Sequence, residues 1–247
     1  MARLHIGTSG WTYRHWAKRW YAGVPSRLWL EHCAGKFTGL EANGTFYRLP
    51  KTETLEDWAR RTPEDFCFAI KAHRFLTHRK KLLDVAEGIQ RQREPALGLG
   101  RKLGCVVWQL PSSFTCDIAR LESFAEELAA WPEPRHALEF RHESWFNDEV
   151  AAVLEKSGLA SVISDASRWR RWDLVTSNLA YVRLHGAERT YFSGYGDRAL
   201  AAWAEKVASW LDKKFEVHVY FDNDAAGHAP HDAMRLIEMV AGSPGVG

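Results

Sequence analysis

The side chains best suited to chemistry stand where short apolar runs of this chain end. Four of them can give or take a proton, as general acid–base catalysis requires: Glu41, Glu139, Asp165 and His185. Three cations can bind and orient a phosphate or a carboxylate: Lys71, Arg141 and Arg183. Five more residues lie at or just after the ends of these apolar runs and can contact the substrate: Trp11, Tyr13, Asn43, Gln109 and Asn223. We therefore predict an acid–base enzyme, of hydrolase or lyase type, that acts on a small anionic and most simply phosphate-bearing substrate.

The apolar runs that carry these residues recur eight times, and segments with helical periodicity lie between them. The expected strands span residues 4–7, 39–43, 66–71, 103–110, 136–140, 160–164, 180–184 and 217–221. Strands that alternate with helices form parallel βαβ units, and eight such units in about 250 residues fit a closed (β/α)8 barrel, a TIM-like α/β fold. Active sites of such barrels lie at the C-terminal ends of the strands, so the polar run ends should meet at one mouth.

Three further features of the sequence complete this expectation. A basic loop at 73–81 should follow the third strand, and a helix should then run from about 82 to 99. On the eighth strand, Phe221 and Asn223 should share the face that leads into the mouth, because side chains alternate along a strand. No linker or change in composition interrupts the chain, so we expect one barrel domain over 1–247 with a frayed tail at about 242–247.

The charges at the expected mouth balance, with three acidic and three basic residues and His185 beside them. A buried, unpaired charge is costly, so these groups should form ion pairs around the ring. Such a ring could be a structural plug that closes the barrel rather than a catalytic site. Apolar residues would close a barrel at least as well, which favours the functional interpretation.

A divalent metal ion is an alternative occupant of the same strand ends. Ligands of the required type follow successive strands: Glu139, Asp165, His185 and Asp224. The three cations oppose a metal electrostatically, so we expect no cofactor and keep a divalent metal as the alternative. Retaining glycoside hydrolysis is disfavoured, because it needs two carboxylates about 5 Å apart. Glu41 and Glu139 should instead lie on opposite sides of the barrel.

The overall composition argues against several classes of protein. A net charge of +2 gives little whole-protein attraction to nucleic acid or to an anionic membrane. The four cysteines form no CxxC pair and have no metal-finger spacing. No apolar run approaches the roughly 20 residues that span a bilayer, and no charged-then-apolar leader precedes the first strand. We expect a cytoplasmic protein without a membrane partner, and the composition indicates no particular oligomeric state.

Seven stretches together resemble the YecE-like family, also called domain of unknown function seventy-two. They are residues 6–13 (IGTSGWTY), 41–50 (EANGTFYRLP), 68–72 (FAIKA), 109–114 (QLPSSF), 138–145 (LEFRHESW), 183–186 (RLHG) and 220–224 (YFDND). The second stretch departs from the family pattern in having Gly44 after Asn43. The resemblance covers nearly the whole chain and implies a single TIM-like barrel. It carries no established reaction, and a fold alone does not give a function.

Two other functions compete with the acid–base enzyme. One is a non-catalytic nucleic-acid or nucleotide-binding module, in which the basic loop at 73–81 binds phosphates and aromatic residues stack on bases. This module predicts binding that weakens steeply with salt. The other is a metal-dependent phosphodiesterase, which would require a stoichiometric divalent ion.

Overall fold

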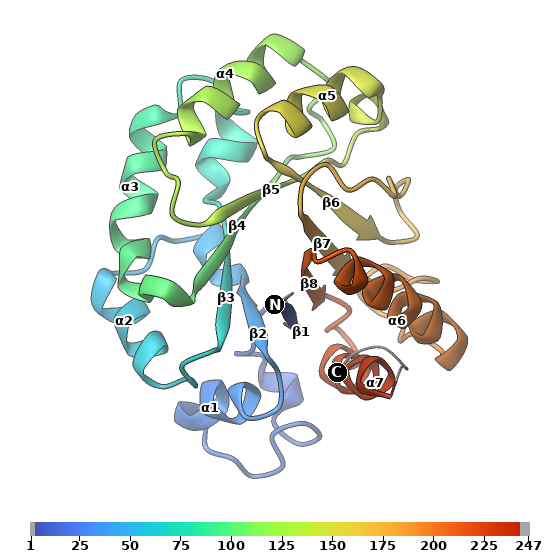
Figure 1. The fold of residues 1–247 in the computed structure, drawn as a ribbon. Coiled ribbons are helices and arrows are strands. Elements are labelled where there is room, and N and C mark those ends of the chain that lie inside the picture. The colour runs from blue at the N-terminus through green and yellow to red at the C-terminus, as the bar shows by residue number, and fades with distance from the viewer. Residues whose placement is uncertain (1–2, 243–247) are drawn as a thin grey trace.

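The computed structural model describes residues 3–242 and shows eight parallel strands arranged as a nearly closed barrel (Figure 1). The strands are β1 (Leu4–Thr8), β2 (Gly39–Ala42), β3 (Cys67–Lys71), β4 (Leu103–Gln109), β5 (Arg135–Glu139), β6 (Ala160–Asp165), β7 (Leu179–Leu184) and β8 (Glu216–Phe221). Neighbours follow the chain order from β2 to β8, and β8 pairs with β1. A parallel bridge between Ser9 and Glu41 joins the two remaining edges. The predicted TIM-like barrel is confirmed.

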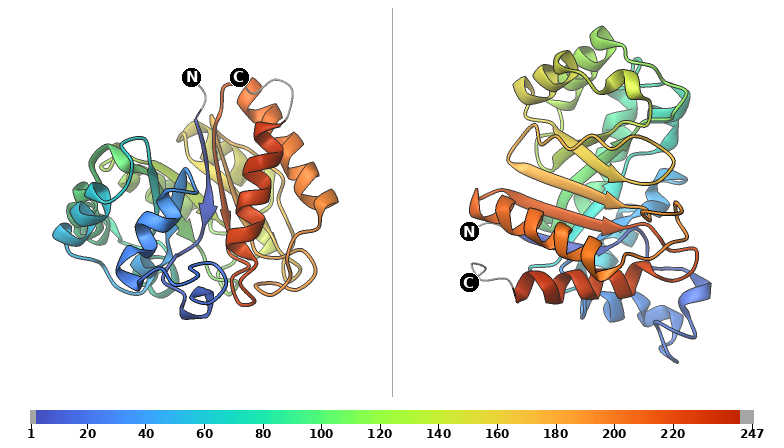
Figure 2. Two further views of the ribbon diagram at one scale, coloured as in Figure 1. Left: turned by 90° about the horizontal axis from the view of Figure 1, so that it is seen from below. Right: turned by 90° about the vertical axis from the view of Figure 1, so that its right-hand side faces the viewer.

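Helices surround these strands on the outside (Figure 1). They are α1 (Trp29–Ala34), α2 (Thr52–Arg60), α3 (Ala86–Ala96), α4 (Ile118–Leu128), α5 (Asp148–Lys156), α6 (Asp197–Asp212) and α7 (Ala229–Ala241). Figure 2 shows α6 and α7 side by side on the outer face of the last strands. Residues 166–178 connect β6 to β7 without a helix, so this part of the rim consists of a loop.

Apolar side chains on both faces of the strands hold the barrel together. Inside it, small residues such as Ala69, Cys105 and Ala137 pack with Tyr181 and Tyr220. Outside, the opposite strand faces pack against the helices in a larger buried cluster. Burial on both faces is the usual state of a parallel sheet. Charged groups of the strands therefore reach water most readily at the strand ends.

The helix expected from about 82 to 99 begins later in the structure, and its last residues, from Leu97 onward, belong to a 3-10 helix. Lys81, Leu82 and Asp84 have φ angles of 49°, 67° and 47°, which a right-handed helix cannot contain. The helix therefore begins at Ala86. Within the expected basic loop, Phe75–Arg79 form a π-helical turn.

None of the helices in residues 3–242 is long and apolar enough to cross a membrane. The tail expected to fray lies outside the described residues from position 243 onward.

Candidate active site at the barrel mouth

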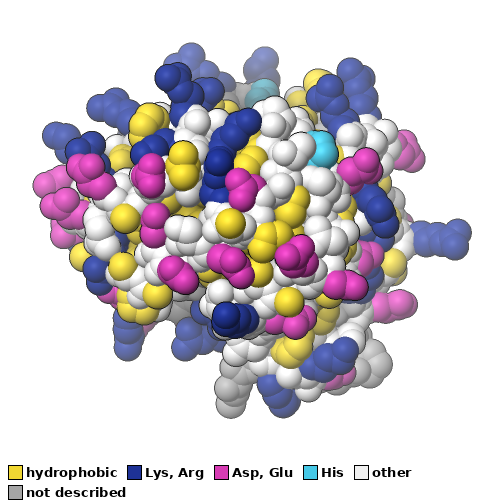
Figure 3. All heavy atoms as spheres, turned by 90° about the horizontal axis from the view of Figure 1, so that it is seen from above, with side chains coloured by type: hydrophobic (Ala, Val, Ile, Leu, Met, Phe, Trp, Pro, Cys, Tyr) yellow, Lys and Arg dark blue, Asp and Glu magenta, His cyan; other side chains and the backbone are white. Residues whose placement is uncertain are grey.

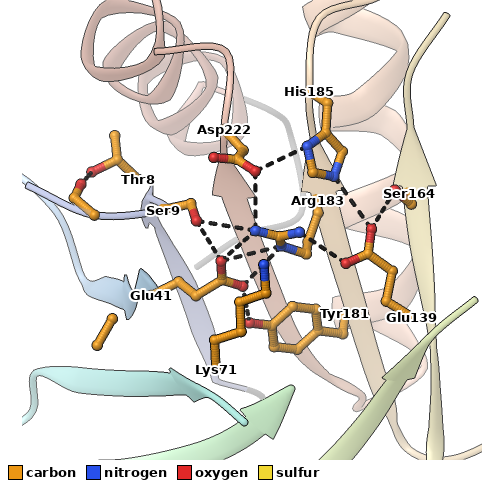
Figure 4. Close-up of polar contacts among 12 residues, drawn as sticks. Thr8, Ser9, Glu41, Lys71, Glu139, Ser164, Tyr181, Arg183, His185 and Asp222 are labelled. Carbon is orange, nitrogen blue, oxygen red and sulfur yellow. Dashed lines mark hydrogen bonds and ion pairs between the residues drawn. The ribbon is translucent and has the colours of Figure 1, made fainter. Parts of the chain in front are cut away.

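Arg183 is the centre of a buried ion-pair network at the C-terminal ends of the strands (Figure 4). Its Nη2 donates to Glu41 Oε1 at 2.7 Å and to Asp222 Oδ2 at 3.1 Å, and its Nη1 donates to Glu139 Oε2 at 2.8 Å. Nη2 also lies 3.1 Å from the Ser9 hydroxyl, and Nε donates to both Glu41 oxygens. Burial opposes the charge, but the three carboxylates raise the pKa of Arg183 well above its usual value. The guanidinium therefore orients protein carboxylates.

Glu41 is held by three side chains, Ser9 after β1 and Tyr181 and Arg183 on β7. The Ser9 hydroxyl donates to Oε1 at 2.5 Å, and the Tyr181 hydroxyl donates to Oε2 at 2.6 Å. Together with Arg183, these donors satisfy both oxygens of a carboxylate that is completely buried. Glu41 is thereby fixed as a structural member of the network.

Glu139 connects the network to the outer part of the mouth. Its Oε1 accepts from the Ser164 hydroxyl at 2.7 Å and lies 2.5 Å from Arg141 Nη2. The same oxygen is 3.4 Å from His185 Nε2. Burial alone would raise the pKa of Glu139, but Arg141 and Arg183 hold it well below the usual range. The two arginines thus hold this carboxylate in its ionised form, in contact with His185.

His185 lies between two carboxylates. Its Nδ1 is 3.0 Å from Asp222 Oδ2, and its Nε2 faces Glu139. Burial would raise the pKa of Asp222, but Arg183 and His185 lower it below the usual value. The three side chains form a continuous path, Asp222–His185–Glu139, along which an imidazole can transfer a proton.

Lys71 is the one cation of the network without a carboxylate partner in the described part of the chain. Its Nζ lies 4.2 Å from the centre of the Phe46 ring, and the residue is 7% exposed. Burial lowers the pKa of Lys71 to about 8, and the Arg183 charge contributes in the same direction. The ammonium group is therefore poorly solvated and lacks an ion pair, an arrangement that suits an incoming anion.

Arg141 pairs with Glu139 and also lies against an aromatic ring. Its guanidinium lies 3.6 Å from the centre of the Trp169 ring, and its Nε is buried without a hydrogen-bond partner. The side-chain oxygen of Asn43 is also buried and unpartnered. These atoms leave hydrogen-bonding capacity that the described residues do not use.

A family model described as a protein of unknown function, DUF72, matches residues 5–245. The chain belongs to the DUF72 family. The family membership predicted from the sequence is thus confirmed. The family model carries no assigned reaction.

Relatives support this membership along the whole chain. The UPF0759 protein YunF of Bacillus subtilis is 22% identical over 272 residues, which cover 96% of this chain and 94% of the relative. The UPF0759 protein YecE of Escherichia coli K12 is 28% identical over 66% of this chain, and the match spans 59% of YecE. The crystal structure of a DUF72 protein from Thermotoga maritima superposes with a TM-score of 0.84 at 26% identity, covering 97% of this chain and 99% of the other. A DUF72 protein from Enterococcus faecalis gives 0.83 at 21% identity over 98% and 96%.

The DUF72 barrel brings together six of the residues selected from the sequence. They are Glu41, Lys71, Glu139, Arg141, Arg183 and His185. Tyr13 is next to them, with its hydroxyl donating to the Ser9 carbonyl at 2.8 Å.

Four other selected residues have different partners in the DUF72 fold. Asp165 binds the Tyr195 hydroxyl at 3.1 Å and Arg171 at 3.2 Å, and its carboxylate makes no ion pair with His185 in the described residues. Asn223 donates to Asp232 at 2.9 Å, beside α7. Gln109 donates to the Leu110 carbonyl at 2.7 Å, and Trp11 packs in the core.

Asp222 is the charged residue of the network that was not predicted from the sequence; the hydrogen-bond donors Ser9, Ser164 and Tyr181 were not predicted either. Phe221 packs in the outer core, whereas Tyr220 belongs to the inner cluster. The alternation on β8 therefore points Asp222 into the mouth and Asn223 away from it. The sequence contains a signal for this, because apolar Val217, Val219 and Phe221 alternate with polar residues at 218, 220 and 222.

The metal site considered for this mouth does not match the donor set in the structure. Glu139 and His185 are adjacent, but Arg141 and Arg183 contact the same carboxylate. The Asp165 carboxylate faces Tyr195. Burial and Asp222 raise the pKa of Asp224 to about 6. This fourth candidate ligand is therefore less fully ionised near neutral pH than a free aspartate.

Two hollows on the same side of this DUF72 barrel flank the network. One, of about 440 Å³, lies between His15, Lys18 and Arg19 after β1 and residues 225–227 after β8. The other, of about 250 Å³, includes His73 and Lys80 after β3. Both are lined in part by basic residues, but neither is lined by the network itself.

Proposed function

We propose that the protein is an acid–base enzyme that acts on a small anionic, most simply phosphate-bearing, substrate at the barrel mouth. The observation that carries this proposal is the position of Lys71. Three buried carboxylates lie in the same network, yet each is paired with Arg183, and none is within ion-pair distance of the Lys71 ammonium group.

A structural plug would not need this lysine. Arg183 already pairs with Glu41, Glu139 and Asp222, and that part of the network closes the barrel. An ammonium group held there without a counterion destabilises the fold. An anionic ligand that contacts Lys71 and the unpartnered Arg141 Nε supplies the missing charge.

The proton-transfer role falls to Glu139 and His185. They are in contact, and Asp222 orients the imidazole from its other side. Asp222 thus lies beside His185, whereas Asp165, one of the proton-transfer residues predicted from the sequence, binds Tyr195. Arg183 and Glu41 act as positioning residues, since their polar atoms are engaged with the protein.

The test is a thermal-shift panel with inorganic phosphate, sugar phosphates, nucleotides and dicarboxylates. A ligand that binds only the folded chain raises its melting temperature. We expect stabilisation by one phosphorylated class in the wild type and its loss in Lys71→Met, which keeps an unbranched chain over the Phe46 ring. The matched control is Lys206→Met on α6, whose ammonium pairs with Asp173 at the surface. An unchanged shift in Lys71→Met places the anion elsewhere, and no shift with any anion refutes the proposal.

A second candidate function, single-stranded nucleic-acid binding, is favoured by two exposed aromatic residues near the second hollow. Tyr47 and Phe75 are 67% and 50% exposed, and His73 lies between them in contact with the Tyr47 carbonyl and the Phe75 amide. Exposed rings beside basic groups can stack on bases. Over α4 and α5, by contrast, acidic and basic side chains are mixed, with Lys and Arg gathered along the upper edge (Figure 3).

Oligonucleotide binding followed by fluorescence anisotropy at increasing salt distinguishes the two functions. Nucleic-acid binding predicts a steep salt dependence and weaker binding in Tyr47→Ala. The enzyme proposal predicts that phosphate raises the melting temperature of Tyr47→Ala as much as that of the wild type.

We also propose that residues 1–247 form one domain and that the protein works in the cytoplasm. The barrel includes elements from Leu4 to Ala241, and the four cysteines are free thiols, as a reducing compartment favours.

A further inference from the structure

A second polar cluster lies inside the barrel, toward the end opposite the mouth. It consists of His5 on β1, Cys67 at the start of β3 and His218 on β8, all buried. One potential ligand atom from each residue lies within 4.8 Å of the other two. The network around Arg183 uses none of these side chains.

The geometry points to a zinc site formed by His5, Cys67 and His218, with Glu216 as the fourth ligand. Imidazole, thiolate and carboxylate are the ligands that zinc takes in proteins, and structural zinc sites are four-coordinate. Glu216 is the first residue of β8, and its Oε1 lies 3.0 Å from His218 Nε2 and 3.7 Å from His5 Nε2. The Glu216 carboxylate thus lies beside the Nε2 atoms of both histidines.

The outer contacts of the two imidazoles support this assignment. His5 Nδ1 is 3.4 Å from the Thr38 carbonyl, and His218 Nδ1 is 3.1 Å from the Tyr220 hydroxyl. A histidine that binds metal through one ring nitrogen usually has the other nitrogen hydrogen-bonded in this way. These contacts orient both rings, whose centres are 4.8 Å apart, with Nε2 toward the cluster.

Gly104 on β4 leaves room for the thiol. A Cβ at this position would stand 2.4 Å from Cys67 Sγ and 3.2 Å from His218 Cε1. Any other residue at 104 would displace the thiol from the two histidines. The absence of a side chain here keeps sulfur and imidazole together.

The bound ion would stabilise the fold and take no part in the reaction. It would connect β1, β3 and β8, and so link strands on both sides of the β1–β2 junction where the barrel is least regularly paired. Groups at the N-terminal end of a barrel contribute to stability, whereas chemistry is performed at the mouth. The site is independent of the proposed function.

The test measures metal binding by the full chain. Protein is treated with a chelator, dialysed and loaded with Zn(II), and bound metal is then measured per chain; a parallel sample is loaded with Co(II). We expect about one ion per chain, a higher melting temperature with Zn(II), and a thiolate-to-cobalt charge-transfer band. Cys67→Ser and His5→Gln should each lose the stoichiometric ion, and Cys67→Ser should lose the band. Cys33→Ser is the matched control, because Cys33 is equally buried but lies on α1.

Two results would overturn the proposal. One is wild-type protein that takes up no stoichiometric Zn(II) or Co(II); the other is a Cys67→Ser variant that binds the ion with the wild-type spectrum. Should Cys67→Ser fail to fold, the cobalt spectrum of the wild type and the metal content of His5→Gln still decide the question. The rise in melting temperature that phosphate causes, which we attribute to Lys71, is measured in the same samples. Absence of zinc binding and absence of anion binding at the mouth are therefore distinguished.

Discussion

Arg183 and Glu139 form a fully buried ion pair, with Nη1 of the arginine 2.8 Å from Oε2 of the glutamate. The same guanidinium pairs with Glu41 and Asp222. Because one cation holds three carboxylates, the geometry of the whole mouth depends on it. In the proposed function, Lys71 and Arg141 therefore contact the ligand, and Arg183 acts through the groups it orients.

Replacing Arg183 by methionine should strongly destabilise the fold. The substitution leaves three carboxylates buried without their common partner, and removing one member of a buried ion pair typically costs about 3–5 kcal/mol. Urea denaturation at neutral pH measures the loss. Arg101→Met is the control, because Arg101 pairs with Glu64 at the surface with side chains 90% and 88% exposed. That change should alter the unfolding free energy by less than about 1 kcal/mol. Equal effects of the two substitutions would contradict the central role of Arg183.

Glu139→Gln should abolish most turnover of whichever substrate the anion panel identifies. The amide preserves the shape of the side chain but cannot accept a proton, and a general acid–base group typically contributes about a hundredfold or more. Steady-state kinetics measures the loss, with Glu143→Gln, an exposed residue in the 3-10 turn after β5, as the control. A variant that keeps normal kcat and kcat/KM removes Glu139 from its assigned role.

Anion binding at the mouth should weaken as the pH rises through about 8, because the cationic form of Lys71 binds the anion and its pKa is lowered to about 8. Calorimetric titration with the identified ligand between pH 6.5 and 9.5 measures the change. Lys71→Arg should keep the affinity across this range, since guanidinium remains protonated. A wild-type affinity that stays constant across this range would show that Lys71 is not the anion's partner.

The same lysine should make stability depend on pH in a definite direction. The pKa of Lys71 is about 8 in the folded chain, below the value near 10.4 of an unfolded lysine, so the unfolded state binds more protons between these pH values. The contribution of Lys71 to the unfolding free energy therefore rises from pH 8 to about 10.5, by at most about 3 kcal/mol. Lys71→Met should lack this rise when compared with the wild type in urea denaturation. Parallel curves for the two proteins would contradict the buried, unpaired ammonium.

The strands and six residues of the mouth could be predicted because their signals are local. An apolar run followed by a charge identifies a strand end without knowledge of its neighbours, and barrel closure then brings Glu41, Glu139 and Arg183 together. Asp165 could not be placed in this way, since its carboxylate contacts Tyr195 and Arg171, which lie in loops that carry no periodicity. The partners of a loop residue depend on how the rim folds over the strands.

The cluster at the other end of the barrel shows a second limit. His5 and His218 are adjacent only because β1 pairs with β8, in a register that aligns these two residues. Cys67 reaches them from β3 across the interior. The spacing of these residues along the chain does not indicate such a site, because whole βα units separate the candidate ligands. In a zinc finger, by contrast, only a few residues separate the ligands of each pair.

A comparison of Asp222→Asn with Asp165→Asn decides which aspartate serves His185. Asp222 Oδ2 is 3.0 Å from His185 Nδ1, whereas the Asp165 carboxylate binds Tyr195. Asp222→Asn should therefore lower kcat by about tenfold or more and shift the pH profile of turnover, because the imidazole loses the charge that orients it. Asp165→Asn should leave that profile unchanged. Measured against the same substrate, the reverse result would return the proton-transfer role to Asp165 and show that the contact between Asp222 and His185 only supports the fold.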